Sequence, residues 1–216
     1  MTAPSAIAAS WTSELVPMSP VLAMYRKRSI GCTASDRSHG RPDASDQGSG
    51  ALALPLVAAD LDLELTPVEG EARTLSSFMT TFPLVPVVLD PYTNESSWIL
   101  DTARRVLTHF KGAGCRPCWI ITCPADDAKT YLGPFADEFL TFADPDRTMA
   151  KNLGVTEAPA LLLVRQDGEV IAKAEGWNAD EWRAVTESIA EFTHWSRPPM
   201  PADGDPGTYS GTPISV

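Results

Sequence analysis

The sequence contains little of what defines several large classes of protein. Four of its 216 residues are cysteine and three are histidine, too few for a disulfide-stapled scaffold and a small supply of the usual metal ligands. It has no run of about 18 apolar residues, which a membrane-spanning helix needs. We find no glycine-rich phosphate loop, no His-x-Glu metal motif and no Gly-x-Ser-x-Gly motif. We therefore expect no membrane span, no metal and no cofactor.

Basic charge is also scarce. The chain holds 28 acidic residues against 17 lysines and arginines, and its net charge is −11. The stretch 51–195 alone carries this charge, with 22 acidic and 11 basic residues. It therefore repels phosphate backbones, and we expect no binding to nucleic acid. The N-terminus has no positive charge ahead of its weakly apolar stretch, unlike a signal peptide, so we expect a cytoplasmic protein.

Composition divides the chain into three parts. Residues 1–50 and 197–216 are rich in Ser, Ala, Pro, Gly and Asp, which predicts a disordered N-terminal arm and a disordered C-terminal tail. Within the arm, residues 15–25 are apolar and are interrupted by two prolines. They form either a weakly structured stretch or a short docking segment. The part between, 51–196, has the apolar patterning of one folded domain.

The patterning of this domain predicts an α/β fold. Three continuous apolar runs have the length of strands buried on both faces of a parallel sheet: 84–90, 118–123 and 160–164. Apolar residues at helical spacing predict helices over 96–111, over 126–139 and after the N-cap Asn178. Alternation over 60–65 predicts a strand with one wet face, and residues 166–168 predict a hairpin turn. The result is a central, mostly parallel sheet with an antiparallel edge hairpin and helices on both faces.

Two motifs in the second half of the chain resemble a known family. Residues 143–155 read ADPDRTMAKNLGV, and residues 158–170 read APALLLVRQDGEV. Together they resemble the peroxiredoxin and AhpC/TSA-like branch of the thioredoxin superfamily, over roughly residues 54–192. The resemblance implies a thioredoxin-like fold, with a cis-proline at Pro159 beside the active site and the backbone of Ala158 facing the substrate. This branch often dimerises, so a homodimer is a further expectation.

The same resemblance places the active site in the loop 90–98, at the carboxyl end of the strand 84–90. Peroxiredoxins have Thr-x-x-Cys there, with the thiolate at the start of a helix. This chain has Thr93-x-x-Ser96, and a serine hydroxyl has neither the low pKa nor the soft nucleophile of a thiolate. The resemblance therefore implies a chain without the peroxidatic cysteine and without peroxidase activity. Thr93 and Ser96 are then expected to cap the next helix.

The loop and the proline also outline a groove for a protein partner or a thiol substrate. Its expected members are Thr93, Ser96, Trp98, Ala158 and Pro159. Trp98 and Trp177 either pack in the core, as most tryptophans do, or line a pocket near the loop.

Cys115 and Cys118 form a C-x-x-C motif, which has the spacing of a thioredoxin-type redox dithiol. The residues after it, 119–122, favour a strand over the helix that such a dithiol requires. The two cysteines are therefore either a redox pair or a loop thiol and a small core residue, and a metal site would need two further ligands. Cys123 is interpreted as a core residue and Cys32 as a solvent thiol.

Three hypotheses for the function follow. The first is a non-catalytic thioredoxin-fold module that binds another protein. The second is a thiol-disulfide oxidoreductase that uses Cys115 and Cys118, in which case the dithiol should contact Pro159. The third is a peroxide-handling enzyme with a displaced cysteine.

Overall fold

The computed structural model of the chain describes residues 58–214. The predicted N-terminal arm and its apolar segment 15–25 lie outside this range. No helix within 58–214 has the length and apolar character needed to cross a bilayer.

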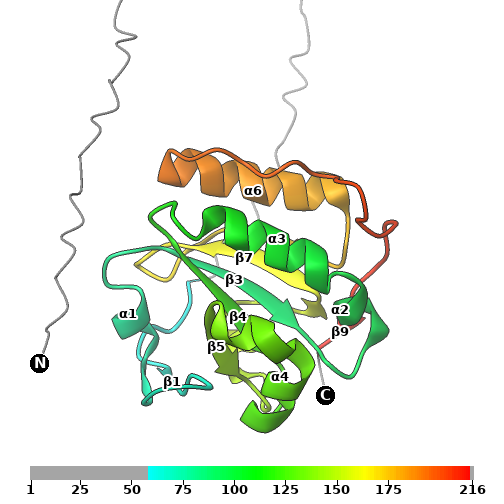
Figure 1. Cartoon of the computed structure of the whole chain (residues 1–216). Helices are drawn as coiled ribbons and strands as arrows, with labels where there is room; N and C mark the ends of the chain where they lie inside the picture. Colours follow the sequence, from blue (N-terminus) through cyan, green and yellow to red (C-terminus); the bar gives the residue numbers. More distant parts are fainter. Residues whose placement is uncertain (1–57, 215–216) are drawn as a thin grey trace, which may run out of the picture. The chain divides into compact units, whose positions relative to one another are not determined.

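The centre of the structure is a five-stranded sheet in the order β5-β4-β3-β7-β8. β3, β4 and β5 run parallel, whereas β7 lies antiparallel to β3 and forms a hairpin with β8 (Figure 1). The strands are β3 Leu84–Leu89, β4 Arg116–Ile121, β5 Leu140–Ala143, β7 Ala160–Val164 and β8 Val170–Glu175. The predicted α/β architecture with an antiparallel edge hairpin is confirmed.

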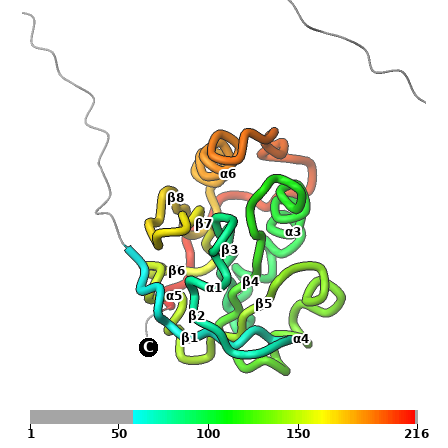
Figure 2. Tube along the Cα trace, turned by 90° about the vertical axis from the view of Figure 1, so that its left-hand side faces the viewer, coloured from blue at the N-terminus to red at the C-terminus, as the bar shows by residue number. Residues whose placement is uncertain are grey.

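Helices cover both faces of this sheet. α3 and α6 lie side by side on one face, and the short helices α1 and α5 lie on the other (Figure 2). The helices are α1 Leu75–Phe78, α2 Asn94–Trp98, α3 Leu100–Phe110, α4 Ala125–Leu132, the 3-10 helix η1 Gly133–Asp137, α5 Thr148–Asn152 and α6 Ala179–Thr193. Asn178 caps α6 as predicted, because its side chain accepts a hydrogen bond from the backbone N–H of Asp180.

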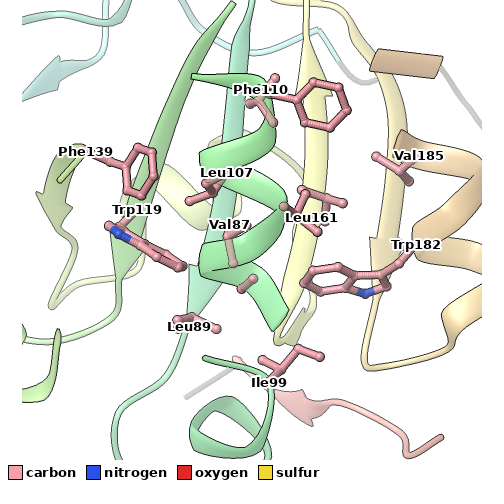
Figure 3. Packing of buried hydrophobic residues seen from close by; sticks show 14 of the residues in the cluster. Val87, Leu89, Ile99, Leu107, Phe110, Trp119, Phe139, Leu161, Trp182 and Val185 are labelled. Atoms are coloured by element: carbon pink, nitrogen blue, oxygen red, sulfur yellow. The ribbon is translucent and has the colours of Figure 1, made fainter. Parts of the chain in front are cut away.

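Each face of the sheet has its own hydrophobic cluster, because neighbouring residues of a strand point to opposite faces. Val87 belongs to the cluster under α3 and α6, where Leu107 and Trp182 pack with it (Figure 3). The next residue, Val88, belongs to the cluster that includes α1 and α5. The sheet is therefore buried on both sides, as the continuous apolar runs predicted.

Three predicted elements differ in the structure. The predicted helix 126–139 is divided at Gly133 into α4 and η1. The predicted strand 60–65 forms only at its end, as β1 Glu64–Leu65, which pairs with β2 Arg73–Thr74. The Asp60 carboxylate accepts a hydrogen bond from the backbone N–H of Asp62, and such a contact turns the chain out of a strand. The predicted helix 96–111 is divided at Ile99 into α2 and α3.

The prediction of a disordered tail over 197–216 is wrong for residues 197–214, which we name the C-terminal segment. Figure 1 shows it returning along α6 and descending past α2 to β9. Its strand β9, Thr212–Pro213, pairs with β6, Glu157–Ala158. Its Met200 is buried in the core cluster under α6. The segment docks mainly through main-chain groups and one carboxylate, so its proline- and glycine-rich composition does not prevent order.

Candidate functional site

Two parts of the chain meet at the carboxyl end of β3. The loop 90–98 leaves β3 and leads through α2 into α3. Pro159 lies beside it, because the next residue, Ala160, pairs with Val88. The peptide bond between Ala158 and Pro159 is cis. The predicted position of the site, at this end of β3, therefore holds both the loop and the proline.

The two hydroxyl residues of the loop face inward. Ser96 is 0 % exposed, and its Oγ accepts a hydrogen bond from the backbone N–H of Asp90 at 2.9 Å. The Thr93 hydroxyl lies 3.2 Å from the same Oγ and 3.0 Å from the Asp90 carbonyl oxygen. Thr93 occupies the N-cap position of α2, but its side chain makes no capping bond, so the predicted capping role is wrong. Both hydroxyls instead close the turn that begins at Asp90.

Asp90 is the central acid of this turn and is itself buried. Its Oδ1 accepts a hydrogen bond from the backbone N–H of Tyr92, and its Oδ2 lies 3.8 Å from the Arg147 guanidinium. Arg147 has a φ of 56° and immediately precedes α5, whose first N–H groups bond to the Asp144 carboxylate. The loop is thus linked to the start of α5 by the Asp90–Arg147 ion pair, while Asp144 orders the first turn of α5.

Cys123, at the end of β4, is a neighbour of the loop that the sequence analysis placed only in the core. Leu89 pairs with Ile121, so the residues that follow them, Asp90 and Cys123, share the same edge of the sheet. Burial, with smaller contributions from the Asp127 and Asp90 carboxylates, raises the pKa of the Cys123 thiol to about 11. This thiol is therefore protonated at neutral pH, the opposite of an activated nucleophile. The parallel alignment of the two apolar runs was the sequence signal for its position.

Tyr92 and Tyr131 surround the same acids. The Tyr92 hydroxyl donates a hydrogen bond to Asp127 at 3.0 Å, and this bond raises the pKa of Tyr92. Burial raises the pKa of Tyr131 to about 12. The polar groups beside Cys123 are therefore neutral phenols and carboxylates, and neither type supplies positive charge to a thiolate.

The residues of the predicted groove all lie at this end of the sheet, and the C-terminal segment contacts two of them, Ala158 and Trp98. Ala158 is fully buried and pairs with Thr212 of β9. Trp98 is 56 % exposed, so its predicted core position is wrong, and its ring makes an edge contact with Tyr209 at 5.4 Å. Trp177 is buried, and its indole N–H donates to the carbonyl of Pro206.

Cys115 and Cys118 lie at the opposite end of the sheet. Arg116, between them, pairs with Leu84 at the start of β3, whereas Pro159 lies at the end of this six-residue strand. At about 3.3 Å per residue, roughly 17 Å of strand separates Arg116 from the proline, and roughly 10 Å separates Cys118, which pairs with Pro86. The contact between dithiol and proline that the oxidoreductase hypothesis requires is not present.

The two sulfurs of the motif also belong to different faces of the sheet. Cys115 lies in the cluster under α3 and α6, and Cys118 lies in the cluster on the other face. Cys115 directly precedes β4 and Cys118 is the third residue of this strand. With one sulfur in each cluster, a disulfide between them would require the start of β4 to rearrange. Burial raises the pKa of Cys115 to about 11 and that of Cys118 further still.

This sheet, with helices on both faces and a site at the carboxyl end of its central strand, defines a thioredoxin-like fold, as predicted. Solved structures with this fold are similar to the chain at low sequence identity. The bacterioferritin comigratory protein of Xanthomonas campestris has a TM-score of 0.51 and 17 % identity, covering 62 % of this chain and 93 % of that one. Peroxidoxin BcpB of Mycobacterium tuberculosis has a TM-score of 0.50 and 16 % identity, covering 64 % and 97 %.

A third similar structure is a cysteine-to-serine variant of peroxiredoxin 6 from Arenicola marina, with a TM-score of 0.51 and 14 % identity, covering 64 % of this chain and 73 % of that one. No family model matches the chain, and no curated protein matches its sequence. At these identities the comparisons establish the thioredoxin-like fold alone.

Proposed function

We propose that the chain is a thioredoxin-fold module that binds another protein and has no peroxidase activity at its 90–98 loop. The observation that carries this proposal is the burial and hydrogen bonding of Ser96. It occupies the expected nucleophile position, yet it is fully buried and its Oγ accepts a hydrogen bond from the main chain of Asp90. A serine held in this way closes a turn and is not presented to a substrate.

The described cysteines do not replace the missing nucleophile. Cys123 is the described thiol nearest to the loop, but burial and two neighbouring acids keep it protonated. This chemistry argues against a peroxide-handling enzyme with a displaced cysteine. The spacing and facing of Cys115 and Cys118 argue against the alternative, a thiol-disulfide oxidoreductase. The features at this edge that suit a partner are main-chain groups and aromatic side chains.

A turnover assay of the full-length chain tests the proposal. Hydrogen peroxide consumption and the reduction of a protein disulfide would be measured with dithiothreitol as the reductant. We expect neither rate to exceed that of a Cys115→Ser/Cys118→Ser/Cys123→Ser variant. A rate that disappears when one of these cysteines is replaced would establish thiol chemistry and overturn the proposal. The cytoplasmic location and the homodimer remain predictions, and light scattering checks the second.

A further inference from the structure

We infer that the C-terminal segment is a built-in ligand of the partner groove, and that the partner supplies an extended peptide with an aromatic-x-Gly-x-x-aliphatic pattern that displaces it. This inference rests on the proposed function, because it names the surface and the class of peptide that the binding module would use. Residues 209–214 are held by main-chain hydrogen bonds, by close backbone packing at Gly211 and by two side chains.

The main chain of the segment pairs with two separate stretches at the edge of the fold. Tyr209 and Trp177 exchange both of their N–H···O=C bonds at 3.0 Å. Further along, the Ile214 N–H donates to the Thr156 carbonyl at 2.8 Å, next to the pairing of β9 with β6. Pairing of this type adds a strand to an exposed edge, and any extended peptide can make it.

Two glycines make the close approach of the backbones possible. A Cβ on Gly211 would lie 2.8 Å from the Glu157 Cβ and 3.1 Å from the Ala158 carbonyl oxygen. A Cβ on Gly176 would lie 2.7 Å from the backbone nitrogen of Gly211, and Gly176 also has a φ of +69°. The groove therefore requires glycine at the Gly211 position of any segment that occupies it in this register.

Side chains on either side of Gly211 fix the rest of the pattern. The Tyr209 ring contacts Trp98, and its hydroxyl donates to the Glu95 carbonyl at 2.7 Å. Five residues after Tyr209, Ile214 is 2 % exposed and joins the core cluster that also contains Ala158. A competing peptide therefore needs an aromatic residue with a hydrogen-bond donor, a glycine two positions later and an aliphatic residue five positions later.

The first half of the segment has its own attachment and acts as a tether. Asp205 accepts hydrogen bonds from Thr102 and Arg105 of α3, and the Pro206 carbonyl accepts from Trp177. Residues 208–214 can therefore leave the groove while 199–206 stay in place. A tethered ligand has an effective concentration in the millimolar range, so a free peptide should compete poorly against the wild-type segment.

A peptide-binding measurement on full-length chains tests the inference. The probe is a fluorescein-labelled synthetic peptide with the sequence of residues 207–216, followed by anisotropy. In a Gly211→Ala chain the resident segment no longer fits, so we expect this variant to bind the probe at least tenfold more tightly than wild type does. The matched control is Gly207→Ala, because a Cβ on Gly207 would meet nothing within 4 Å, and it should bind as weakly as wild type.

Two further measurements test the glycine requirement of the groove and replace the first variant if it does not fold. A probe with alanine at the Gly211 position should lose at least tenfold in affinity for the Gly211→Ala chain. If that chain does not fold, Tyr209→Ala replaces it, with the same expected gain over wild type. Equal probe affinity in wild type and a folded variant would overturn the inference. So would a wild-type dimer in which the C-terminal segments are exchanged between two copies.

The two proposals fail separately. Absence of probe binding leaves the turnover assay unchanged, and the chain would remain a module whose groove lies elsewhere. Turnover that depends on a cysteine would overturn the proposed function whatever the probe does.

Discussion

The two ends of the central sheet differ in the functional groups that they hold. At the carboxyl end of β3, the loop 90–98 and Pro159 lie beside main-chain groups that pair with the C-terminal segment. Cys115 and Cys118 lie toward the amino end. They form the C-x-x-C motif, which is the feature of the sequence that suggested redox chemistry, and both are buried. The carboxyl end holds no activated thiol, because the pKa of its Cys123 is raised, and the C-x-x-C motif lies away from the loop and the proline. Position in the fold, rather than a motif, therefore decides what a residue can do.

The local structure of the C-x-x-C motif explains this difference. An activated dithiol begins a helix, where N–H groups stabilise the thiolate. Here the motif leads into β4, and the residues after it are Trp119, Ile120 and Ile121, which prefer a strand. The two sulfurs are buried on different faces of the sheet, and for Cys118 the effect of burial on the pKa outweighs the stabilising charge of Arg116.

Thiol reactivity should show the largest effect. Burial raises the pKa of Cys115 from 9.0 to about 11, which reduces the thiolate fraction at neutral pH about a hundredfold. In a Cys32→Ser chain we expect iodoacetamide to label Cys115 and Cys118 on the order of a hundredfold more slowly than in urea. Mass spectrometry after timed labelling measures these rates. A reversible disulfide between Cys115 and Cys118 would contradict this comparison of the two ends.

The next largest effect should be a difference in unfolding free energy between serine variants of the two cysteines. Cys118 is 0 % exposed within an apolar cluster, so Cys118→Ser buries a hydroxyl and should lower the unfolding free energy by about 2 kcal/mol. Cys115→Ser should lower it by less than about 1 kcal/mol, because the Cys115 thiol already donates to the Phe110 carbonyl and a hydroxyl can do the same. Urea denaturation at pH 7 measures both values. Equal losses would show that the two sites are equally tolerant of polarity.

At the carboxyl end, the anchor of the C-terminal segment can be weakened by Asp205→Asn. Its carboxylate accepts hydrogen bonds from Thr102, Arg105 and the backbone of Ala202, so the variant should lose about 1.5 kcal/mol at pH 7. Asp203→Asn is the matched control, since Asp203 is exposed in the same segment. Urea denaturation of the three chains measures the difference.

The same anchor should depend on pH. Burial alone would raise the pKa of Asp205, but the hydrogen bonds from Thr102, Ala202 and Arg105 outweigh it and lower the pKa below the ordinary 3.8. The stabilisation is then complete above the unfolded-state pKa and is lost as the pH falls through the folded-state value. The stability difference between wild type and Asp205→Asn should therefore begin to shrink as the pH falls below 3.8 and vanish below the folded-state pKa. A difference that does not shrink on acidification would mean that the charge is not its source.

The sequence predicted the central strands and α6 better than the C-terminal segment, and the reason is physical. The central strands and α6 are defined by apolar residues at regular spacing, such as the run 160–164, and regular burial leaves a regular pattern. The C-terminal segment has no such pattern, because a few contacts from Asp205, Tyr209 and Ile214 order it together with main-chain bonds. Its composition therefore predicted disorder.

The sequence predicted where the loop 90–98 and Pro159 lie, but not how the side chains around them are packed. The resemblance and the strand 84–90 placed Thr93, Ser96 and Pro159 at one edge, and the structure has them there. The burial of Ser96 and the position of Cys123 near Asp90 depend on the packing of loop 90–98 against its neighbours. Such packing follows from tertiary contacts that spacing along the chain does not encode.

The smallest effect should come from the exposed aromatic contact at the carboxyl end. Trp98→Ala removes an edge contact with Tyr209, worth about 0.5–1 kcal/mol, and should barely change the urea midpoint. It should instead speed amide hydrogen exchange at Tyr209 and Ile214, whose N–H groups bond to Trp177 and Thr156, because the segment then opens locally without global unfolding.

The matched control for this change is Trp195→Ala. Trp195 is 47 % exposed, close to the 56 % of Trp98, and it follows α6 rather than the loop 90–98. Its replacement should leave exchange at Tyr209 and Ile214 unchanged. If both variants speed exchange equally, the effect reflects general loosening of the domain, and Trp98 has no particular part in holding the segment in the groove.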